Sequence, residues 1–205
     1  MIKRYLIGKH LAKGVILYSV LCMYMLHTSV IAQNIATPSI RLNNNVVVSN
    51  ALTPITWLAD NTHSGKLPVQ VLLQFQSLPS ASAKAQLKDN GIILLDYLPG
   101  NVYTAIVDSL PPASVFQSSG ISLIADVQPG WKISDELKQA LTLQADFADV
   151  TVLFTGDYSR ADIDAQFYEL GAEIISERIT MGYCHIKIPV DKVLQLAQWH
   201  HVSYM

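Results

Sequence analysis

Apolar and polar residues in the second half of the chain repeat the pattern of the first half at an offset of 80 or 81 residues. Gly91 and Gly171 are 171 − 91 = 80 positions apart, and Val69 and Val150 are 150 − 69 = 81 positions apart. Each copy reads as an apolar run, a polar helical stretch, a glycine, two apolar runs around a tight turn, a second helical stretch and a last apolar run. This order predicts a β-α-β-β-α-β unit in each half.

The first unit is predicted over residues 66–126. Every second residue from Val69 to Phe75 is apolar, which is the period of a half-buried strand. Ser80 is a candidate N-cap for the next helix, and Asn90-Gly91 is a typical helix end. The remaining elements are expected to be strands over 92–97 and 102–107, a helix that begins at 111–112 and a strand over 121–125.

The second unit is predicted over residues 146–205, with clearer signals. Ser159 and Asp162 have the spacing of a capping box, and Ile163, Phe167 and Leu170 form one helical stripe. Strands are expected over 150–154, 172–179, 183–188 and 202–205, with a last helix that begins at 189. The predicted fold class is therefore α+β, with two ferredoxin-like units in tandem and antiparallel sheets.

Two segments lie outside the units. Residues 33–65 are predicted to be a flexible lead-in, because they contain three consecutive asparagines, two Thr-Pro steps and little periodicity. A short run over 46–48 is the one candidate strand there. Residues 127–145 are predicted to be a structured connector, with a turn at Pro129-Gly130 and a short helix that Ser134 caps and that runs to Leu143.

Residues 1–32 have the layout of a secretory signal peptide. Four basic residues precede an apolar stretch over 14–26, and Val30 and Ala32 supply suitable side chains for cleavage after Ala32. The apolar stretch is short for a membrane span, so we expect export to the periplasm, the cell surface or the exterior, without a stable membrane span after cleavage. An uncleaved N-terminal anchor is the alternative.

Removal of the signal peptide makes the chain acidic. All 16 Asp and Glu and 10 of the 14 Lys and Arg follow residue 32, which gives 10 − 16 = −6. A chain with this charge and no basic run is not expected to bind nucleic acid. Cys184 is the one cysteine after residue 32, and it alternates with Ile186 and Ile188 on one strand face. We expect a buried thiol there, with a reactive nucleophile as the alternative.

No catalytic or metal-binding pattern stands out in the sequence. Zinc sites need ligands at helical or hairpin spacing, which the four histidines after residue 32 lack, and the adjacent pair His200-His201 is expected to diverge into solvent. His63-Ser64-Gly65 is not accompanied by the strained turn of a serine nucleophile. We therefore expect no enzyme activity, metal or cofactor. The other candidates are assigned to a helix dipole (Asp162 and Asp164) or to packing (Trp131, Tyr168 and Trp199).

A protein-binding surface is the functional feature that the pattern does predict. In the second unit, the residues that alternate with the buried strand positions would share one open sheet face: Thr151, Leu153, Tyr183, His185 and Lys187. A secreted binding module is one reading of such a face. A small-molecule site between the repeats is another, but it requires polar groups that converge, and the sequence shows no such set.

Residues 66–205 also resemble the N-terminal prodomain of secreted bacterial subtilisin-like serine proteases of the fervidolysin-like type. The similarity lies in three parts of the chain: 69–75 with 87–103, the connector 127–137, and 171–189 with 202–204. The resemblance implies a propeptide that acts as intramolecular chaperone and inhibitor. Its sheet would dock on surface helices of the protease catalytic domain, in cis or in trans, and a tail would lie in the substrate cleft.

The chain departs from that family at its C-terminal end. It stops at Met205, and the Asp, His and Ser blocks of a subtilisin-like catalytic domain are missing from the sequence. We therefore expect the propeptide region of a truncated or split protease, or a stand-alone relative, which would not itself hydrolyse peptides.

Overall fold

The computed structural model describes residues 38–41, 47–62, 65, 67–143, 145–178 and 181–205. The chain divides into two compact units, residues 1–37 and 38–205, and every described residue belongs to the second. The predicted signal peptide and its cleavage position at Ala32 lie outside the described residues. No helix in the described part of the chain is long and apolar enough to cross a membrane.

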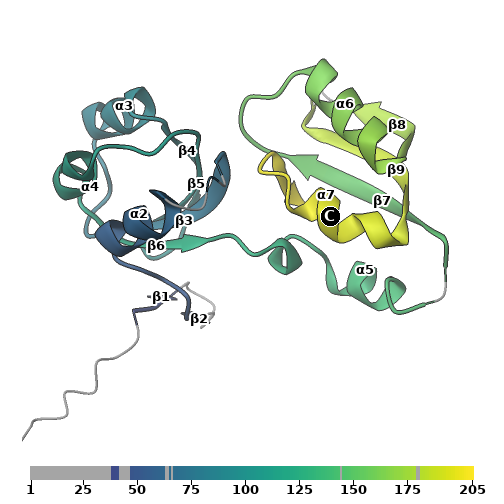
Figure 1. Ribbon diagram of the computed structural model, residues 1–205, viewed down its shortest axis with the longest axis horizontal. Coiled ribbons are helices and arrows are strands. Elements are labelled where there is room, and N and C mark those ends of the chain that lie inside the picture. The colour runs from purple at the N-terminus through teal and green to yellow at the C-terminus, as the bar shows by residue number, and fades with distance from the viewer. Residues whose placement is uncertain (1–37, 42–46, 63–64, 66, 144, 179–180) are drawn as a thin grey trace, which may run out of the picture. The chain divides into compact units, whose positions relative to one another are not determined.

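The first repeat forms a four-stranded antiparallel sheet with strand order β4-β5-β3-β6 (Figure 1). Helices α3 and α4 connect the outer strands to the centre, so the topology is β-α-β-β-α-β. The elements are β3 (Val69–Phe75), α3 (Ala81–Asp89), β4 (Ile92–Leu98), β5 (Val102–Val107), α4 (Ala113–Ser119) and β6 (Ile121–Asp126).

The second repeat has the equivalent strand order, β10-β7-β9-β8, and is also antiparallel throughout. Its elements are β7 (Phe147–Phe154), α6 (Arg160–Leu170), β8 (Glu173–Arg178), β9 (Tyr183–Pro189), η3 (Val190–Lys192), α7 (Val193–Ala197) and β10 (Val202–Tyr204). The predicted α+β fold class, with two ferredoxin-like units in tandem, is confirmed.

Local sequence signals explain where the helices begin and end. Ser80 accepts a hydrogen bond from the Ala83 backbone N–H at 3.2 Å, as expected for an N-cap. Ser159 and Asp162 form a full capping box, in which the Ser159 N–H donates to Asp162 Oδ2 at 2.9 Å. Gly171 ends α6 with a φ of 64°, a left-handed conformation that favours glycine.

Each repeat has a core between its helices and one face of its sheet. In the second repeat, Phe167 of α6 and Leu196 of α7 share one cluster with Val152 of β7 and Ile186 of β9. In the first repeat, Leu87 of α3 and Phe116 of α4 pack with Leu73 of β3 and other strand residues. Separate apolar clusters therefore fill the two repeats.

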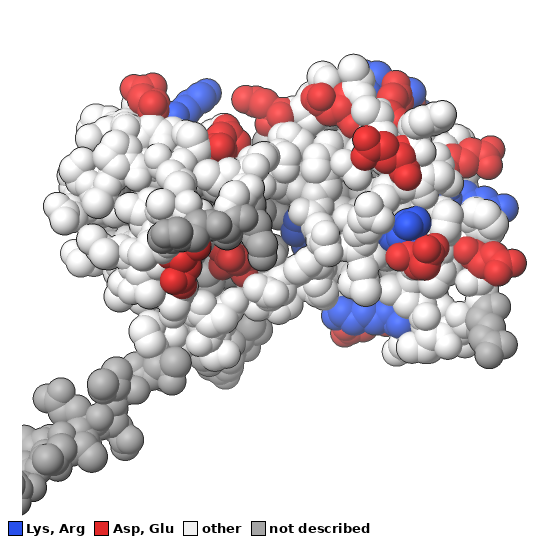
Figure 2. All heavy atoms as spheres, viewed as in Figure 1, with Lys and Arg blue, Asp and Glu red and all other residues white. Residues whose placement is uncertain are grey.

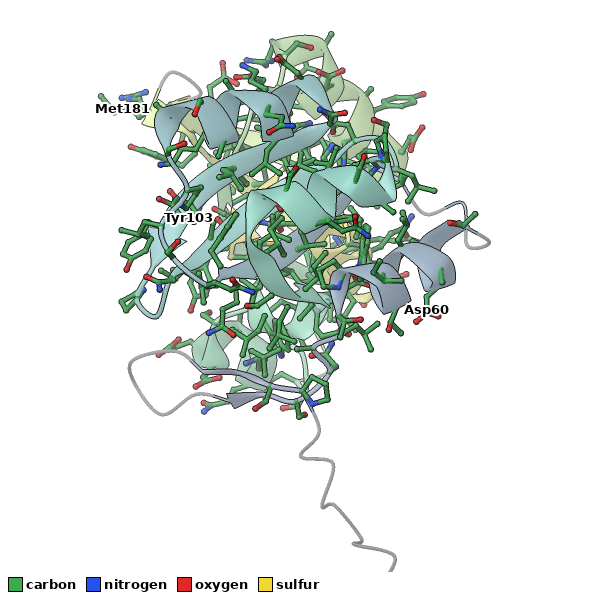
Figure 3. All side chains as sticks on the ribbon, turned by 90° about the vertical axis from the view of Figure 1, so that its left-hand side faces the viewer. Asp60, Tyr103 and Met181 are labelled. Carbon is green, nitrogen blue, oxygen red and sulfur yellow. The ribbon has the colours of Figure 1, made fainter. Side chains whose placement is uncertain are left out.

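The described part of the lead-in contains two short strands and a helix, where the sequence had led us to expect a flexible segment over residues 33–65. β1 (Ile40–Arg41) pairs with β2 (Val47–Val48), and residues Pro54–Thr62 form helix α2, which packs on β6 and α4 (Figure 3, where Asp60 marks α2). The Trp57 side chain is 1% exposed, and its Nε1–H donates to Asp126 Oδ1 at 2.7 Å. The Thr-Pro step at 53–54 starts this helix, because Thr53 Oγ1 accepts from the Thr56 N–H at 3.3 Å.

The lead-in also covers the second face of the first sheet. Ile40 of β1, Val48 of β2 and Ala51 pack against residues that point away from α3 and α4, namely Leu72, Val102 and Ala125. The first sheet is thus covered on both faces. For this reason its central strand β3 is almost continuously buried.

The connector, residues 127–145, contains two short helices and belongs with the second repeat. It contains η1 (Pro129–Trp131) and α5 (Asp135–Ala140), a shorter helix than the one expected to reach Leu143. Ile133 lies in the core of the second repeat. The Met205 N–H donates to the Lys132 carbonyl and the Ser134 N–H donates to the Met205 carbonyl, each at 2.7 Å, so the connector pairs with the end of the last strand.

Candidate functional site

The five residues predicted to share an open sheet face do lie together on the second sheet. Thr151 pairs directly with His185, and Leu153 with Tyr183, across β7 and β9. Thr151 Oγ1 and His185 Nδ1 are 3.2 Å apart, within hydrogen-bond distance. Lys187 follows two positions after His185, on the same face of β9.

Two aromatic residues that the sequence analysis did not select extend this face. Phe147, at the start of β7, is 50% exposed, and the Lys187 Nζ lies 5.2 Å from the centre of its ring. Tyr204 of β10 is 44% exposed and pairs with Leu153, which is itself 40% exposed. We call this surface the open face, defined by Phe147, Thr151, Leu153, Tyr183, His185, Lys187 and Tyr204.

The period of the strands explains why Phe147 was within reach of prediction and Tyr204 was not. Phe147 is in register with Thr151 and Leu153 at alternate positions, so the same period predicts it. Tyr204 reaches the open face only because the pairing of β10 with β7 shifts between Val202 and Tyr204. Such a shift has no clear signal in a three-residue strand.

The open face differs from the matching face of the first sheet. Both helices of the second repeat pack on the other side of the sheet, with Val150, Val152 and Cys184. In the first repeat, β1, β2 and Ala51 cover this face. The open face instead exposes large apolar side chains, and exposed apolar groups rimmed by polar ones are typical of interaction sites.

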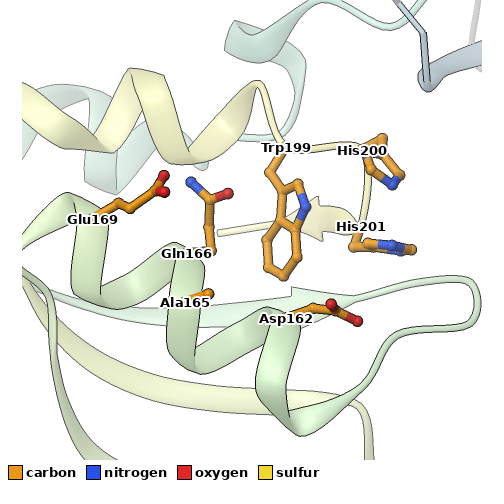
Figure 4. Close-up of a pocket in the computed structure, with 7 residues that line it drawn as sticks. All are labelled: Asp162, Ala165, Gln166, Glu169, Trp199, His200 and His201. Carbon is orange, nitrogen blue, oxygen red and sulfur yellow. The ribbon is translucent and has the colours of Figure 1, made fainter.

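A second candidate is a groove of about 320 Å³ between α6 and the turn that joins α7 to β10 (Figure 4). Trp199 stands between the two elements, and polar side chains surround it. The residues that line the groove are Asp162, Ala165, Gln166, Glu169, Trp199, His200 and His201.

The two histidines of this groove are partly buried and their rings contact each other at a tilt of 47°, which corrects the expectation that they diverge into solvent. Their ring centroids are 4.1 Å apart, and the His201 ring lies 5.3 Å from that of Trp199. Burial, the neighbouring His201 and the charge of Lys132 lower the pKa of His200 to about 4. Hydrogen bonds from Ser159, together with the nearby His201, lower the pKa of the Asp162 carboxyl.

The polar groups of the groove are largely committed to local structure. Asp162 completes the capping box of α6, and His201 Nδ1 is 3.1 Å from the Thr155 carbonyl oxygen. No group of three or more His, Cys, Asp and Glu side chains with the placement of a metal site occurs among the described residues. The groove therefore has an aromatic wall but no set of ligands for a metal, and the open face is the stronger candidate.

The other residues considered from the sequence show no sign of a functional role in their contacts among the described residues. Cys184 is fully buried, its Sγ donates to the Ser176 carbonyl at 3.5 Å, and burial raises the pKa of the thiol to about 11. Asp164 accepts from Arg160 Nε at 2.8 Å. The expectation of packing is wrong for Tyr168, which is 87% exposed, whereas Trp131 is about half exposed and lines a cavity with Leu72 and Leu98.

His63 and Ser64 lie outside the described residues. Figure 2 shows acidic and basic side chains interspersed over the second repeat, without a continuous basic patch among the described residues on the face in view.

Comparison with known proteins gives one family match. Residues 34–128 match a family described as a domain of unknown function (DUF8729). No curated protein and no solved structure matches the chain. The matched region contains the lead-in together with the complete first repeat, in agreement with the packing of α2 on β6 and α4. The open face lies beyond this region, in the second repeat.

Proposed function

We propose that the second repeat binds a folded protein through the open face, and that the partner is the catalytic domain of a subtilisin-like serine protease. The chain would act on that domain as a propeptide-type chaperone and inhibitor. The observation that carries the proposal is the exposure of Phe147, Leu153 and Tyr204 on the sheet face opposite to the one on which α6 and α7 pack.

The composition of the open face supports a protein partner. Aromatic and aliphatic side chains form its apolar part, and Thr151, His185 and Lys187 add hydrogen-bonding groups and charge. Protein interfaces typically combine aromatic anchors with a polar rim. A broad, strand-built surface suits a protein better than a small molecule.

The choice of a protease as the partner rests on the resemblance of residues 66–205 to fervidolysin-like prodomains. In that family the ferredoxin-like sheet is the docking element, and the open face is the corresponding uncovered surface here. The expected export of the chain would bring it into the compartment of secreted proteases. In this role the chain itself needs no catalytic group.

Inhibition and binding of a bacterial subtilisin by purified residues 33–205 test the proposal. Leu153→Asp places a charge at the centre of the open face, and we expect it to weaken binding about 10-fold or more, the size of a typical anchor loss. Leu194→Asp is the matched control, because Leu194 is 54% exposed but lies on α7, on the opposite side of the sheet. Circular dichroism would verify that both variants are folded.

Two results would contradict the proposal. Equal binding of both variants would remove the open face from the interaction. Failure to slow any subtilisin at high micromolar excess would remove the protease as partner. Binding of a purified non-protease protein that Leu153→Asp abolishes would keep the surface but replace the protease with the alternative, a secreted binding module.

A further inference from the structure

Two buried polar side chains, one on β3 and one in the connector, lie near the point where the chain leaves the first repeat. Gln70 on β3 is 7% exposed, and Lys132, which follows η1, is 3% exposed. Two cavities of about 390 and 520 Å³ adjoin them, and both cavities are lined by Gln70, Val127 and Lys132. Cavities of this size are typical of small-molecule sites.

Gln70 presents an acceptor that the described protein does not satisfy. Its side-chain Oε1 is buried and has no hydrogen-bond partner among the described residues. Its backbone carbonyl is paired, because it accepts from the Val127 N–H at 2.9 Å. Buried acceptors are almost always paired, since losing hydration without a new hydrogen bond is costly. The cavity wall at Gln70 is therefore suited to a ligand that carries an N–H or O–H donor.

Lys132 presents a buried positive charge. Its Nζ donates to the Trp199 carbonyl at 2.9 Å, and no ion pair joins it to a carboxylate among the described residues. Burial lowers the pKa of its amine to about 8, so the amine is still mostly protonated at neutral pH. Its charge also contributes to the lowered pKa of His200. A buried cation without a charged partner favours an anion beside it.

The walls of the smaller cavity are largely apolar. Leu72, Leu98 and Val127 line it together with Gln70 and Lys132, and the hydroxyl residues Thr104 and Ser203 also belong to its lining. Carboxylates are also present: Asp96 lines the smaller cavity, and Asp126, which accepts from Trp57, lines the larger. An anionic ligand would thus place its charge near Lys132, away from these side chains.

We propose that these cavities bind a small apolar carboxylate that also carries an N–H or O–H donor. The Lys132 ammonium receives the carboxylate, Gln70 Oε1 accepts from the donor, and the leucine and valine side chains contact the apolar part. Gln70 and Lys132 thus supply the converging polar groups that a small-molecule site requires and that the sequence did not reveal. They lie 132 − 70 = 62 positions apart in the chain.

Calorimetric titration of residues 33–205 with three matched probes tests this site. N-acetyl-L-leucine has the carboxylate, the N–H and the apolar side chain, so we expect a dissociation constant of about 1 mM or tighter. N-acetyl-L-leucinamide lacks the carboxylate, and 4-methylpentanoate lacks the N–H. We expect the amide to bind at least about 10-fold more weakly, because charge-assisted hydrogen bonds are the stronger ones, and 4-methylpentanoate to bind between the two.

Variants separate the two contacts. Lys132→Met should remove the preference for the acid over the amide, whereas Gln70→Met should remove the preference for N-acetyl-L-leucine over 4-methylpentanoate. Leu153→Asp on the open face should leave binding unchanged, so this site and the protease partner can fail independently. The proposal would be overturned if the wild type bound N-acetyl-L-leucine and N-acetyl-L-leucinamide equally, or if neither released heat at millimolar concentration. These results come from the wild type alone, so they hold even if a variant fails to fold.

Discussion

At the scale of single residues, the environment of His200 has the clearest consequence. Its pKa is lowered to about 4 because it is partly buried beside His201 and Lys132. The folded protein therefore resists protonation of this ring, while the unfolded chain takes up the proton near the ordinary histidine pKa of about 6.5. Over this range the unfolded state binds more protons, so stability falls as the pH falls.

His200→Gln is expected to reduce the loss of stability between about pH 6.5 and pH 4, because glutamine cannot be protonated there. Urea unfolding of the wild type and the variant at several pH values measures the effect. The two free energies of unfolding should converge or cross toward the acid end of the range. Parallel pH profiles would show that His200 is protonated equally in the folded and unfolded states.

At the scale of the elements, helix α2 shows where sequence patterns did and did not suffice. The strands and helices of both repeats follow from alternation, capping residues and glycine ends, as at Ser80, Ser159 and Gly171. For α2, the Thr-Pro step indicated a loop, although the same step can start a helix with proline in its first turn. The burial of Trp57 depends on α4 and β6, and such distant contacts leave no periodic signal in nine residues.

Trp57→Ala is expected to destabilise the first repeat by about 3 to 5 kcal/mol, since it removes a large buried ring. Trp57→Phe keeps most of the apolar contact but loses the N–H donated to Asp126, so a smaller loss of about 1 to 2 kcal/mol is expected. Ile55→Ala, at an exposed position of the same helix, is the control and should change stability by less than about 0.5 kcal/mol.

Chemical denaturation of the three variants provides the measurement. If the free energy of unfolding of Trp57→Ala matched that of the wild type, α2 would not be part of the folded core.

The candidate sites were predictable where they depend on local strand periodicity and not where they depend on distant contacts. A period of two fixed which residues of β7 and β9 share a face, so Thr151, Leu153, Tyr183, His185 and Lys187 were found together. The contact between the His200 and His201 rings depends instead on the turn before β10 and on Trp199. Gln70 and Lys132 are far apart in the chain, and only the folded connector brings both to shared cavities.

At the scale of the whole molecule, the two repeats have separate apolar clusters. The cluster with Ile133 and Phe167 contains no residue before the connector, and the two clusters of the first repeat contain none beyond Val127. Small units of this kind gain limited stability from one core. The connector ties into the second repeat through Lys132, Ser134 and Met205, so we expect each repeat to respond to core mutations on its own.

Phe167→Ala is expected to cost the second repeat about 3 to 5 kcal/mol, because it empties the centre of that cluster. Amide hydrogen exchange would report the two repeats separately. Protection should fall in β7 and β9 and stay unchanged in β3 and β5. An equal fall in all four strands would show that the repeats unfold as one cooperative body.

Strand geometry gives each repeat an outward sheet face that can change independently of its core. Neighbouring residues of a strand project to opposite sides, so substitutions on the outward side leave the helix-packed interior untouched. In the first repeat, the outward residues Leu72, Val102 and Ala125 pack against the N-terminal segment. In the second repeat, the outward residues Thr151 and His185 lie on the open face. Exchanging these outward side chains between the repeats would transfer the interaction surface from one repeat to the other, while both repeats retain their fold.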